Sequence, residues 1–141
     1  MEIAKQLSAD HIINIELEDV HQRINDITNN SGVDISIETG GYPLANSQSR
    51  DSVSCGGRIL IVGPQKEYLL DVEDIVWHEK SIIGSFWSTE TDFIKGIQMV
   101  NNKKLKLKPL ITHTFSLDQV DAAFNLLDKR EECVIKVVIT P

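Results

Sequence analysis

Histidine, cysteine and carboxylate side chains are the candidates for metal chemistry and nucleophilic catalysis in this sequence. The four histidines are His11, His21, His78 and His113, and none stands at a ligand spacing from another histidine or a cysteine. A catalytic zinc site needs about three such ligands converging on one point. The spacing therefore predicts no metal site within this chain and indicates histidines scattered over surfaces and strand ends.

The two cysteines, Cys55 and Cys133, are too few for a disulfide framework or a four-cysteine zinc site, and we expect a reducing, cytoplasmic location. Cys55 has no histidine near it in sequence, so a small buried residue is favoured over a nucleophile. Neither a Gly-x-Ser-x-Gly elbow nor a Walker loop occurs.

Glycines could bring the backbone close to a ligand. Gly40, Gly41 and Gly63 follow expected strands, and the pair Gly56-Gly57 precedes one. Glycine after a parallel strand lets the backbone approach a ligand at the carboxyl edge of the sheet. Glycines also punctuate ordinary α/β loops, and the Gly-x-Gly-x-x-Gly phosphate motif is absent. Both interpretations of these glycines stay open.

The charge balance limits the classes of partner. There are 21 acidic and 14 basic residues, which gives a net charge of −7. A negative field argues against a nucleic-acid or anionic-membrane binder. The basic patch at residues 103–108 therefore favours a solvated helix end over a phosphate site. No apolar run reaches the roughly 20 residues of a membrane span, and residues 1–10 lack the apolar core of a signal peptide.

Strand-like and helix-like segments alternate along the 141 residues. The expected strands are residues 11–14, 33–39, 58–62, 68–70, 81–86, 110–115 and 134–140. The expected helices are residues 18–30, residues 43–53, a helix capped by Thr89 and a helix after a capping box at Ser116 and Gln119. This alternation predicts an α/β fold with a parallel sheet.

The ordered motifs resemble the C-terminal part of the zinc-type medium-chain alcohol, sorbitol and threonine dehydrogenase family. The matching segments are residues 4–14 (AKQLSADHIIN), 32–34 (GVD), 38–41 (ETGG), 56–63 (GGRILIVG), 83–85 (IGS), 110–118 (LITHTFSLD), 123–124 (AF) and 135–139 (IKVVI). One departure is Ser8, where the family usually has glycine. The resemblance covers nearly the whole chain.

The resemblance implies a partial Rossmann-like parallel sheet, with strands 3 to 6 of the nucleotide-binding domain in residues 1–104. Residues 105–141 would form a C-terminal strand-helix-strand segment belonging to the catalytic domain. The family's zinc ligands and glycine fingerprint would lie upstream, outside this chain. Direct pairing of residues 11–14 with residues 33–39 is expected to close the gap that strands 1 and 2 leave.

The resemblance also implies cofactor-contacting positions. Thr39, Gly40 and Gly41 match the loop over the adenosine ribose. The nicotinamide wall is matched by Val62, Gly63, Pro64, Ser81 and Ile83. Lys136 matches a position near the pyrophosphate. By the same resemblance no residue of this chain is catalytic and none binds metal.

The function implied is the C-terminal half of an NAD(P)-linked, zinc-dependent alcohol or polyol dehydrogenase, inactive by itself. NAD or NADP and zinc would belong to the complete enzyme, with no zinc held by this chain. The alternative is a non-catalytic dimerisation or interaction module left by gene truncation.

Two kinds of partner are expected. One is a second copy, paired through an exposed edge running from Tyr68 to Leu70 and from Ser81 to Ser85. The other is a separately encoded N-terminal half. The apolar surfaces at Phe115, Phe124 and residues 134–139 are expected to be covered by self-association.

Overall fold

The computed structural model describes residues 2–66, 68, 70–129 and 133–141, which form two compact units. One unit is Ile13–Trp87, and the other combines Met1–Ile12 with Ser88–Pro141. The domain boundary predicted after residue 104 separates the two domains of the family, which differ from these two compact units. That boundary stays a prediction.

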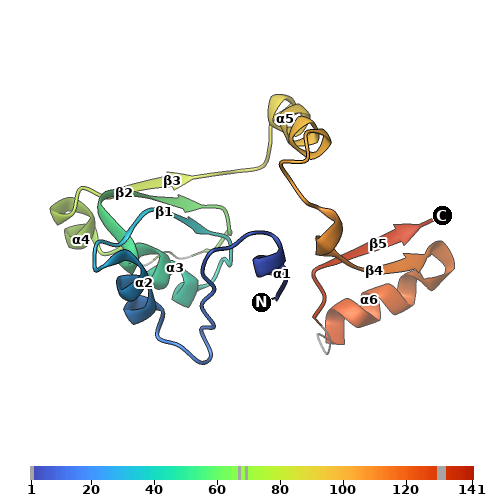
Figure 1. The fold of residues 1–141 in the computed structure, drawn as a ribbon, viewed down its shortest axis with the longest axis horizontal. Coiled ribbons are helices and arrows are strands. Elements are labelled where there is room, and N and C mark those ends of the chain that lie inside the picture. The colour runs from blue at the N-terminus through green and yellow to red at the C-terminus, as the bar shows by residue number, and fades with distance from the viewer. Residues whose placement is uncertain (1, 67, 69, 130–132) are drawn as a thin grey trace. The chain divides into compact units, whose positions relative to one another are not determined.

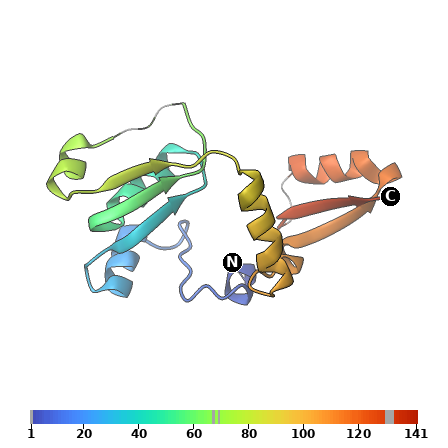
Figure 2. The same cartoon turned by 90° about the horizontal axis from the view of Figure 1, so that it is seen from above.

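The Ile13–Trp87 unit contains a parallel sheet of three strands (Figure 1). The strands are β1 (Val33–Glu38), β2 (Val53–Ile61) and β3 (Ser81–Gly84), in the order β1-β2-β3. Figure 2 shows them side by side with β1 at one edge. The predicted α/β class with a parallel sheet is thereby confirmed.

Three helices accompany these strands: the first precedes β1, the second connects β1 to β2 and the third connects β2 to β3. They are α2 (Val20–Thr28), α3 (Pro43–Asp51) and α4 (Val72–Trp77). Local signals set their starts: Asp19 accepts a hydrogen bond from the Gln22 amide at the start of α2, and Pro43 opens α3. Helices α2 and α3 lie on one side of the sheet (Figure 1). Between that side and the helices lies the buried core, with Ile59 wholly inaccessible and Val53 5% exposed.

The strand predicted at residues 11–14 is absent, and its predicted pairing with residues 33–39 is wrong. Residues 11–14 have no regular structure, and in the part of the chain that the structure describes β1 pairs only with β2. The reason is local. The Asn14 amide donates to Glu18 Oε1, and the Asn14 carbonyl accepts from the Leu17 and Glu18 amides. These turn bonds satisfy the backbone group that a ladder would need.

The turn predicted at Gly56-Gly57 is instead a bulge inside β2. The register jumps from Val33 opposite Val53 to Ile35 opposite Arg58. Gly56 adopts φ of +70°, which suits glycine. The bulge exposes Cys55, so the expectation that this cysteine is buried is wrong.

The edge strand predicted from Tyr68 to Leu70 is absent from the two residues of this range that the structure describes. Tyr68 and Leu70 have no strand conformation, and Leu69 lies outside the described residues. Within the part of the chain that the structure describes, β3 alone forms that side of the sheet.

The other unit contains α1 (Glu2–Gln6), α5 (Glu90–Asn101), β4 (Ile111–Ser116), α6 (Val120–Lys129) and β5 (Lys136–Thr140), with short 3-10 turns at Lys108–Leu110 and Leu117–Gln119. β4 and β5 are parallel and α6 connects them, as the predicted strand-helix-strand segment requires. Both predicted capping boxes, at Thr89 and at Ser116, are present. Ser8 has φ of +76°, which explains why glycine suits that position. Within the described ranges, no helix has the length and apolarity to cross a membrane.

Candidate functional site

The carboxyl ends of β1 and β2 bring together two of the predicted cofactor loops, residues 39–41 and residues 62–64. The amides of Val62 and Gly63 both donate to the Glu38 carbonyl, at 2.8 Å and 3.1 Å. Ligands of open parallel sheets bind outside the carboxyl ends of the strands. The predicted loops therefore stand where the fold places a ligand.

Gly41 and Gly63 allow the two loops to touch backbone to backbone. A Cβ on Gly63 would lie 2.4 Å from the Gly41 nitrogen and 2.9 Å from the Thr39 carbonyl carbon. Gly41 has φ of +67°, and a Cβ there would lie 3.0 Å from the Pro64 oxygen. No larger residue fits at either position without moving backbone. These two glycines thus have a structural role that exists whether or not a ligand is bound.

The Glu38 side chain organises the same loop from inside. It is 3% exposed, and its Oε1 accepts from the Gly40 and Gly41 amides at 2.7 Å and 2.8 Å. Because both amides are bound to a carboxylate, this loop is not a nest of free N–H groups for phosphate.

The second oxygen of this carboxylate is one of several buried polar atoms that have no hydrogen-bond partner. In the described part of the chain they are Glu38 Oε2, Asn46 Nδ2, Tyr68 OH and both amide atoms of Gln65. Burial raises the pKa of the Tyr68 phenol, and the negative charge of Glu38 raises it further.

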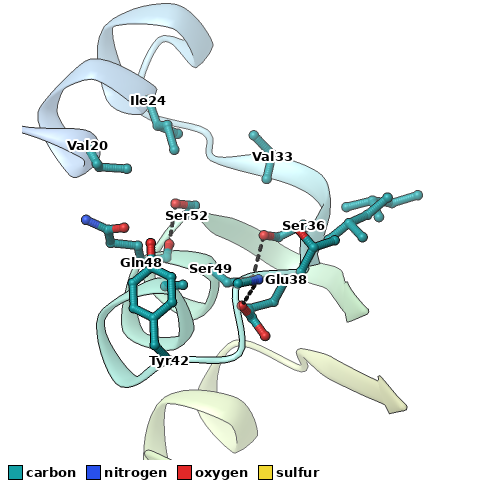
Figure 3. Close-up of a pocket in the computed structure, with 14 residues that line it drawn as sticks. Val20, Ile24, Val33, Ser36, Glu38, Tyr42, Gln48, Ser49 and Ser52 are labelled. Atoms are coloured by element: carbon teal, nitrogen blue, oxygen red, sulfur yellow. Dashed lines mark hydrogen bonds between the residues drawn. The ribbon is translucent and has the colours of Figure 1, made fainter. Parts of the chain in front are cut away.

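A hollow of about 480 Å³ lies beside the loop, along β1 (Figure 3). Val20 and Ile24 of α2 line one end, and Tyr42 and Ser49 lie on the α3 side. The hydroxyls of Ser36 and Ser49 are hydrogen-bonded to each other at 2.7 Å. That bond shows that the Ser36 face of β1 is the face toward α3.

The remaining predicted site residues are not all gathered at this edge. Ser81 is the first residue of β3 and lies opposite Arg58, at the amino end of the sheet. Ile83 lies opposite Leu60, one position before the strand ends. Lys136 begins β5 in the other unit. The structure thus brings together residues 39–41 and 62–64, places Ile83 on the neighbouring strand and leaves Ser81 at the far end.

A second polar cluster ties α4, β3 and α3 together. Lys80 Nζ donates to Asp74 Oδ2 at 2.9 Å and to the Arg50 carbonyl at 3.2 Å, and His78 Nδ1 lies 2.9 Å from Asp74 Oδ1. Burial alone would raise the pKa of Asp74. The hydrogen bond from Lys80 and the charges of Lys80, His78 and Arg50 outweigh it and hold that pKa below its usual value. The cluster thus has a structural role, because Lys80 links Asp74 of α4 to the Arg50 backbone of α3.

The residues that the structure describes do not provide a site for zinc. Across the described residues, no group of three or more histidine, cysteine, aspartate or glutamate side chains could hold a metal ion. We therefore assign no step to a metal in this chain, and metal content stays a prediction for analysis in solution.

Sequence reasoning missed Glu38 as the organiser of the loop. The pattern that could have found it is an acidic residue at the end of a strand, directly before Thr39-Gly40-Gly41. Such a side chain can fold back onto the amides two and three residues later, as Glu38 does.

Comparison with known proteins agrees with this architecture. Residues 1–102 match the family model described as zinc-binding dehydrogenase. Sorbitol dehydrogenase of Bacillus subtilis (strain 168) is 39% identical over 144 residues, covering 100% of this chain and 40% of that protein. The crystal structure of 2R,3R-butanediol dehydrogenase from Bacillus subtilis has a TM-score of 0.85 and 25% identity, covering 99% of this chain and 40% of that one. An NAD-dependent alcohol dehydrogenase has a TM-score of 0.81 and 26% identity, with the same coverage of 99% and 40%.

The chain belongs to the zinc-binding dehydrogenase family. It spans about 40% of the length of the curated relatives it matches and corresponds to their C-terminal part. The resemblance inferred from the sequence motifs is thereby confirmed. Membership implies NAD(P) and zinc in the full-length enzymes.

Proposed function

We propose that this chain is the C-terminal part of an NAD(P)-linked, zinc-dependent alcohol or polyol dehydrogenase, and that it supplies part of the cofactor wall. The observation that supports this most is the junction of residues 39–41 with residues 62–64 at the carboxyl ends of β1 and β2. By itself the chain is inactive, because the zinc ligands and the glycine fingerprint belong to the remainder of the enzyme.

The proposed role of each loop follows from its hydrogen bonds. Glu38 occupies the Gly40 and Gly41 amides, so this loop offers carbonyl acceptors to the hydroxyls of a ribose rather than donors to a phosphate. Residues 62–64 hold the backbone that faces the nicotinamide. In the complete enzyme, a bound zinc would supply Lewis-acid polarisation of the alcohol and a bound dinucleotide would supply the hydride acceptor. This chain's own contribution is to bind and orient the cofactor.

The test supplies the missing remainder. A polypeptide carrying the N-terminal part of Bacillus subtilis sorbitol dehydrogenase, up to the matched region, is mixed with this chain and zinc ions. NADH formation from NAD and sorbitol is followed by absorbance. We expect activity in the mixture and none with either polypeptide alone. A single-chain chimera of the same two parts is assayed in parallel. A folded chimera without activity, or activity of this chain alone, would contradict the proposal.

We also propose a homodimer through the edge of β3, from Ser81 to Ser85. In the described part of the sheet, β3 pairs with β2 on one side only. Two such edges related by a two-fold axis would pair antiparallel and extend one sheet across both copies. The same edge supports the alternative of a non-catalytic dimerisation module, which the activity test above separates from the enzyme.

Gly84→Lys tests this edge. A Cβ at Gly84 meets no described atom within 4 Å, so the lysine fits sterically and places a charge at the pairing edge. We expect sedimentation to show a dimer for the unaltered chain and a monomer for this variant. Gly96→Lys is the matched control, because Gly96 of α5 is equally open. A monomeric unaltered chain at micromolar concentration would rule the dimer out.

A further inference from the structure

Asn46 stands opposite Glu38 across the interface between α3 and β1. The hydroxyls of Ser36 and Ser49 are hydrogen-bonded across this interface. Glu38 lies two residues after Ser36, on the same face of β1. Because α3 runs back along the sheet to reach the parallel strand β2, Asn46 lies almost one turn before Ser49, toward the carboxyl end of β1. The register therefore places Asn46 against Glu38.

The first turn of α3 also packs closely on the loop that Glu38 holds. A Cβ on Gly40 would lie 3.3 Å from the Cβ of Ala45, the residue directly before Asn46. This part of the helix therefore lies against residues 39–41. A change in the bonding of Asn46 acts close to the candidate cofactor loop.

Asn46 and Glu38 carry complementary hydrogen-bonding groups that are both unmet. Each residue is 3% exposed. In the described part of the chain, Asn46 Nδ2, which is a donor, and Glu38 Oε2, which is an acceptor, are buried atoms without a hydrogen-bond partner. A polar group that loses water without gaining a partner costs stability, and the cost is larger for a charged group. A bond from Nδ2 to Oε2 would remove both costs together.

A second donor, the Tyr68 phenol, interacts electrostatically with Glu38. Its oxygen is also buried without a partner among the described residues, and the charge of Glu38 raises its pKa while that of Arg50 lowers it. Tyr68 is less suited to hold the carboxylate, because it is only partly buried and belongs to no helix or strand, whereas Asn46 is fixed on α3. Tyr68 and Arg50 both keep their charge state from acidic to neutral pH.

We propose that Asn46 is a positioning residue for the cofactor loop, and that its side-chain amide donates to Glu38 Oε2. Glu38 Oε1 binds the Gly40 and Gly41 amides, so a second anchor on Oε2 fixes the orientation of the whole carboxylate. Rotation of side-chain torsion angles makes the bond, because β1 and α3 already place the two residues opposite each other. This inference rests on the proposed function, since a loop held in one shape lowers the ordering cost of dinucleotide binding.

Amide exchange at Gly40 and Gly41 reports how firmly Glu38 is held. Asn46→Leu removes the donor at similar volume, and we expect both amides to exchange about tenfold faster, as for the loss of one hydrogen bond to a charged group. Asn46→Asp should have a larger effect at neutral pH, because two carboxylates would face each other. That excess should shrink as the pH falls and the two carboxyl groups share a proton.

Ser47→Asp is the matched control. It places the same charge on the next residue of α3, whose hydroxyl bonds the Leu44 carbonyl of its own helix. We expect it to change exchange at neither glycine amide. A pH-dependent effect of Ser47→Asp equal to that of Asn46→Asp would show that general helix charge, and not a contact with Glu38, controls the loop.

A swap of the two side-chain types separates a specific bond from a general loss of packing. In the double variant Glu38→Gln with Asn46→Asp, the glutamine oxygen can accept from the Gly40 and Gly41 amides while its NH₂ group donates to the new carboxylate. We expect this double variant to restore most of the protection that Asn46→Asp loses. Should Asn46→Leu fail to fold, this comparison of double and single variant decides the inference.

Three results would overturn the inference: unchanged exchange in Asn46→Leu, no rescue by the double variant, or loosening of the same amides by Tyr68→Phe in place of Asn46→Leu. Binding of NADH is measured separately with the chimera described above, and Asn46→Leu should weaken it severalfold. Equal binding with and without that substitution would overturn the positioning role. A chimera that binds no dinucleotide, beside amides that respond as expected, would remove the proposed function and leave the contact of Asn46 with Glu38 standing.

Discussion

Gly63 is the single residue on which the candidate cofactor wall depends most closely. Any side chain at this position would begin with a Cβ only 2.4 Å from the Gly41 nitrogen and 2.9 Å from the Thr39 carbonyl carbon. Glu38 then fixes the other side of the same loop through the Gly40 and Gly41 amides. The loop is held rigid by contacts that precede ligand binding, which is the preorganised state that a cofactor wall requires.

Gly63→Ala should therefore push residues 39–41 outward. We expect the free energy of unfolding to fall by about 1–3 kcal/mol, as for other overpacked sites. Urea unfolding followed by tryptophan fluorescence measures this well, because both tryptophans, Trp77 and Trp87, lie in the Ile13–Trp87 unit. Gly84→Ala is the matched control and should change stability by less than about 0.5 kcal/mol, since no described atom lies near its Cβ. Equal effects of the two substitutions would contradict the close contact.

The Lys80–Asp74 pair gives a prediction with a pH dependence. The Lys80 side chain is 6% exposed and that of Asp74 is 23% exposed. We expect Lys80→Met to lower the free energy of unfolding by about 1–3 kcal/mol at neutral pH, because buried polar partners are left unpaired. The Asp74 pKa is lowered in the folded state, so the pair stabilises fully above the ordinary aspartate value of 3.8. The stabilisation is lost as the pH falls through the lowered pKa.

Parallel urea titrations from neutral to acidic pH check this sign. The difference between Lys80→Met and the unaltered chain should shrink toward zero on the acid side. Lys66→Met, at an exposed lysine of the same unit, should show little difference at any pH. A difference for Lys80→Met that grows on acidification would show that the pair does not act as described.

Helix α5 carries a glycine in its interior, and this residue allows the contribution of helix propensity to stability to be tested. Gly96 lies in the middle of Glu90–Asn101, and a Cβ there meets no described atom within 4 Å. Gly96→Ala should stabilise the helix by about 0.5–1 kcal/mol, because glycine is the poorer helix former by that amount. Thermal unfolding followed by far-ultraviolet circular dichroism should show a higher midpoint. An unchanged or lower midpoint would indicate that Gly96 is needed for a packing contact.

Elements with strong local signals could be predicted from the sequence, and elements decided by distant partners could not. The capping boxes at Thr89 and Ser116 announce their helices within four residues, and both helices are present. Residues 11–14 have strand-forming composition, yet Asn14 is held by its own turn bonds with Glu18. The bulge at Gly56 depends on the register between β1 and β2, which no single strand encodes.

The candidate site follows the same division. Residues 39–41 and 62–64 were predicted as cofactor positions through a family resemblance, and topology brings them together because neighbouring parallel strands end at one edge. Ser81 came from the same resemblance but starts its strand, and its distance from that edge depends on the register of β3. The burial of the Glu38 side chain depends on three-dimensional packing, and so does its unpartnered Oε2 atom. The hydrophobic periodicity of the sequence does not reveal such packing.

At the scale of the whole molecule, the chain corresponds to the C-terminal part of the longer zinc-binding dehydrogenases that it matches, about 40% of their length. In the described residues, the outer edge of β1 has no neighbouring strand. The other compact unit also exposes a large apolar side chain, because Phe124 of α6 is 64% exposed. Cover of this surface by self-association therefore stays a prediction.

Calorimetric titration with NADH and NADPH tests whether this chain forms part of a dinucleotide-binding wall. The titrand is the chimera that joins the N-terminal part of Bacillus subtilis sorbitol dehydrogenase to this chain, compared with the same chimera carrying Gly63→Ala and with this chain alone. We expect one reduced dinucleotide bound per chimera, weaker binding when Gly63 is alanine, and weak or undetectable binding by the chain alone. A folded chimera that binds neither dinucleotide, or that binds equally well with alanine at position 63, would contradict the claim that this chain forms the cofactor wall.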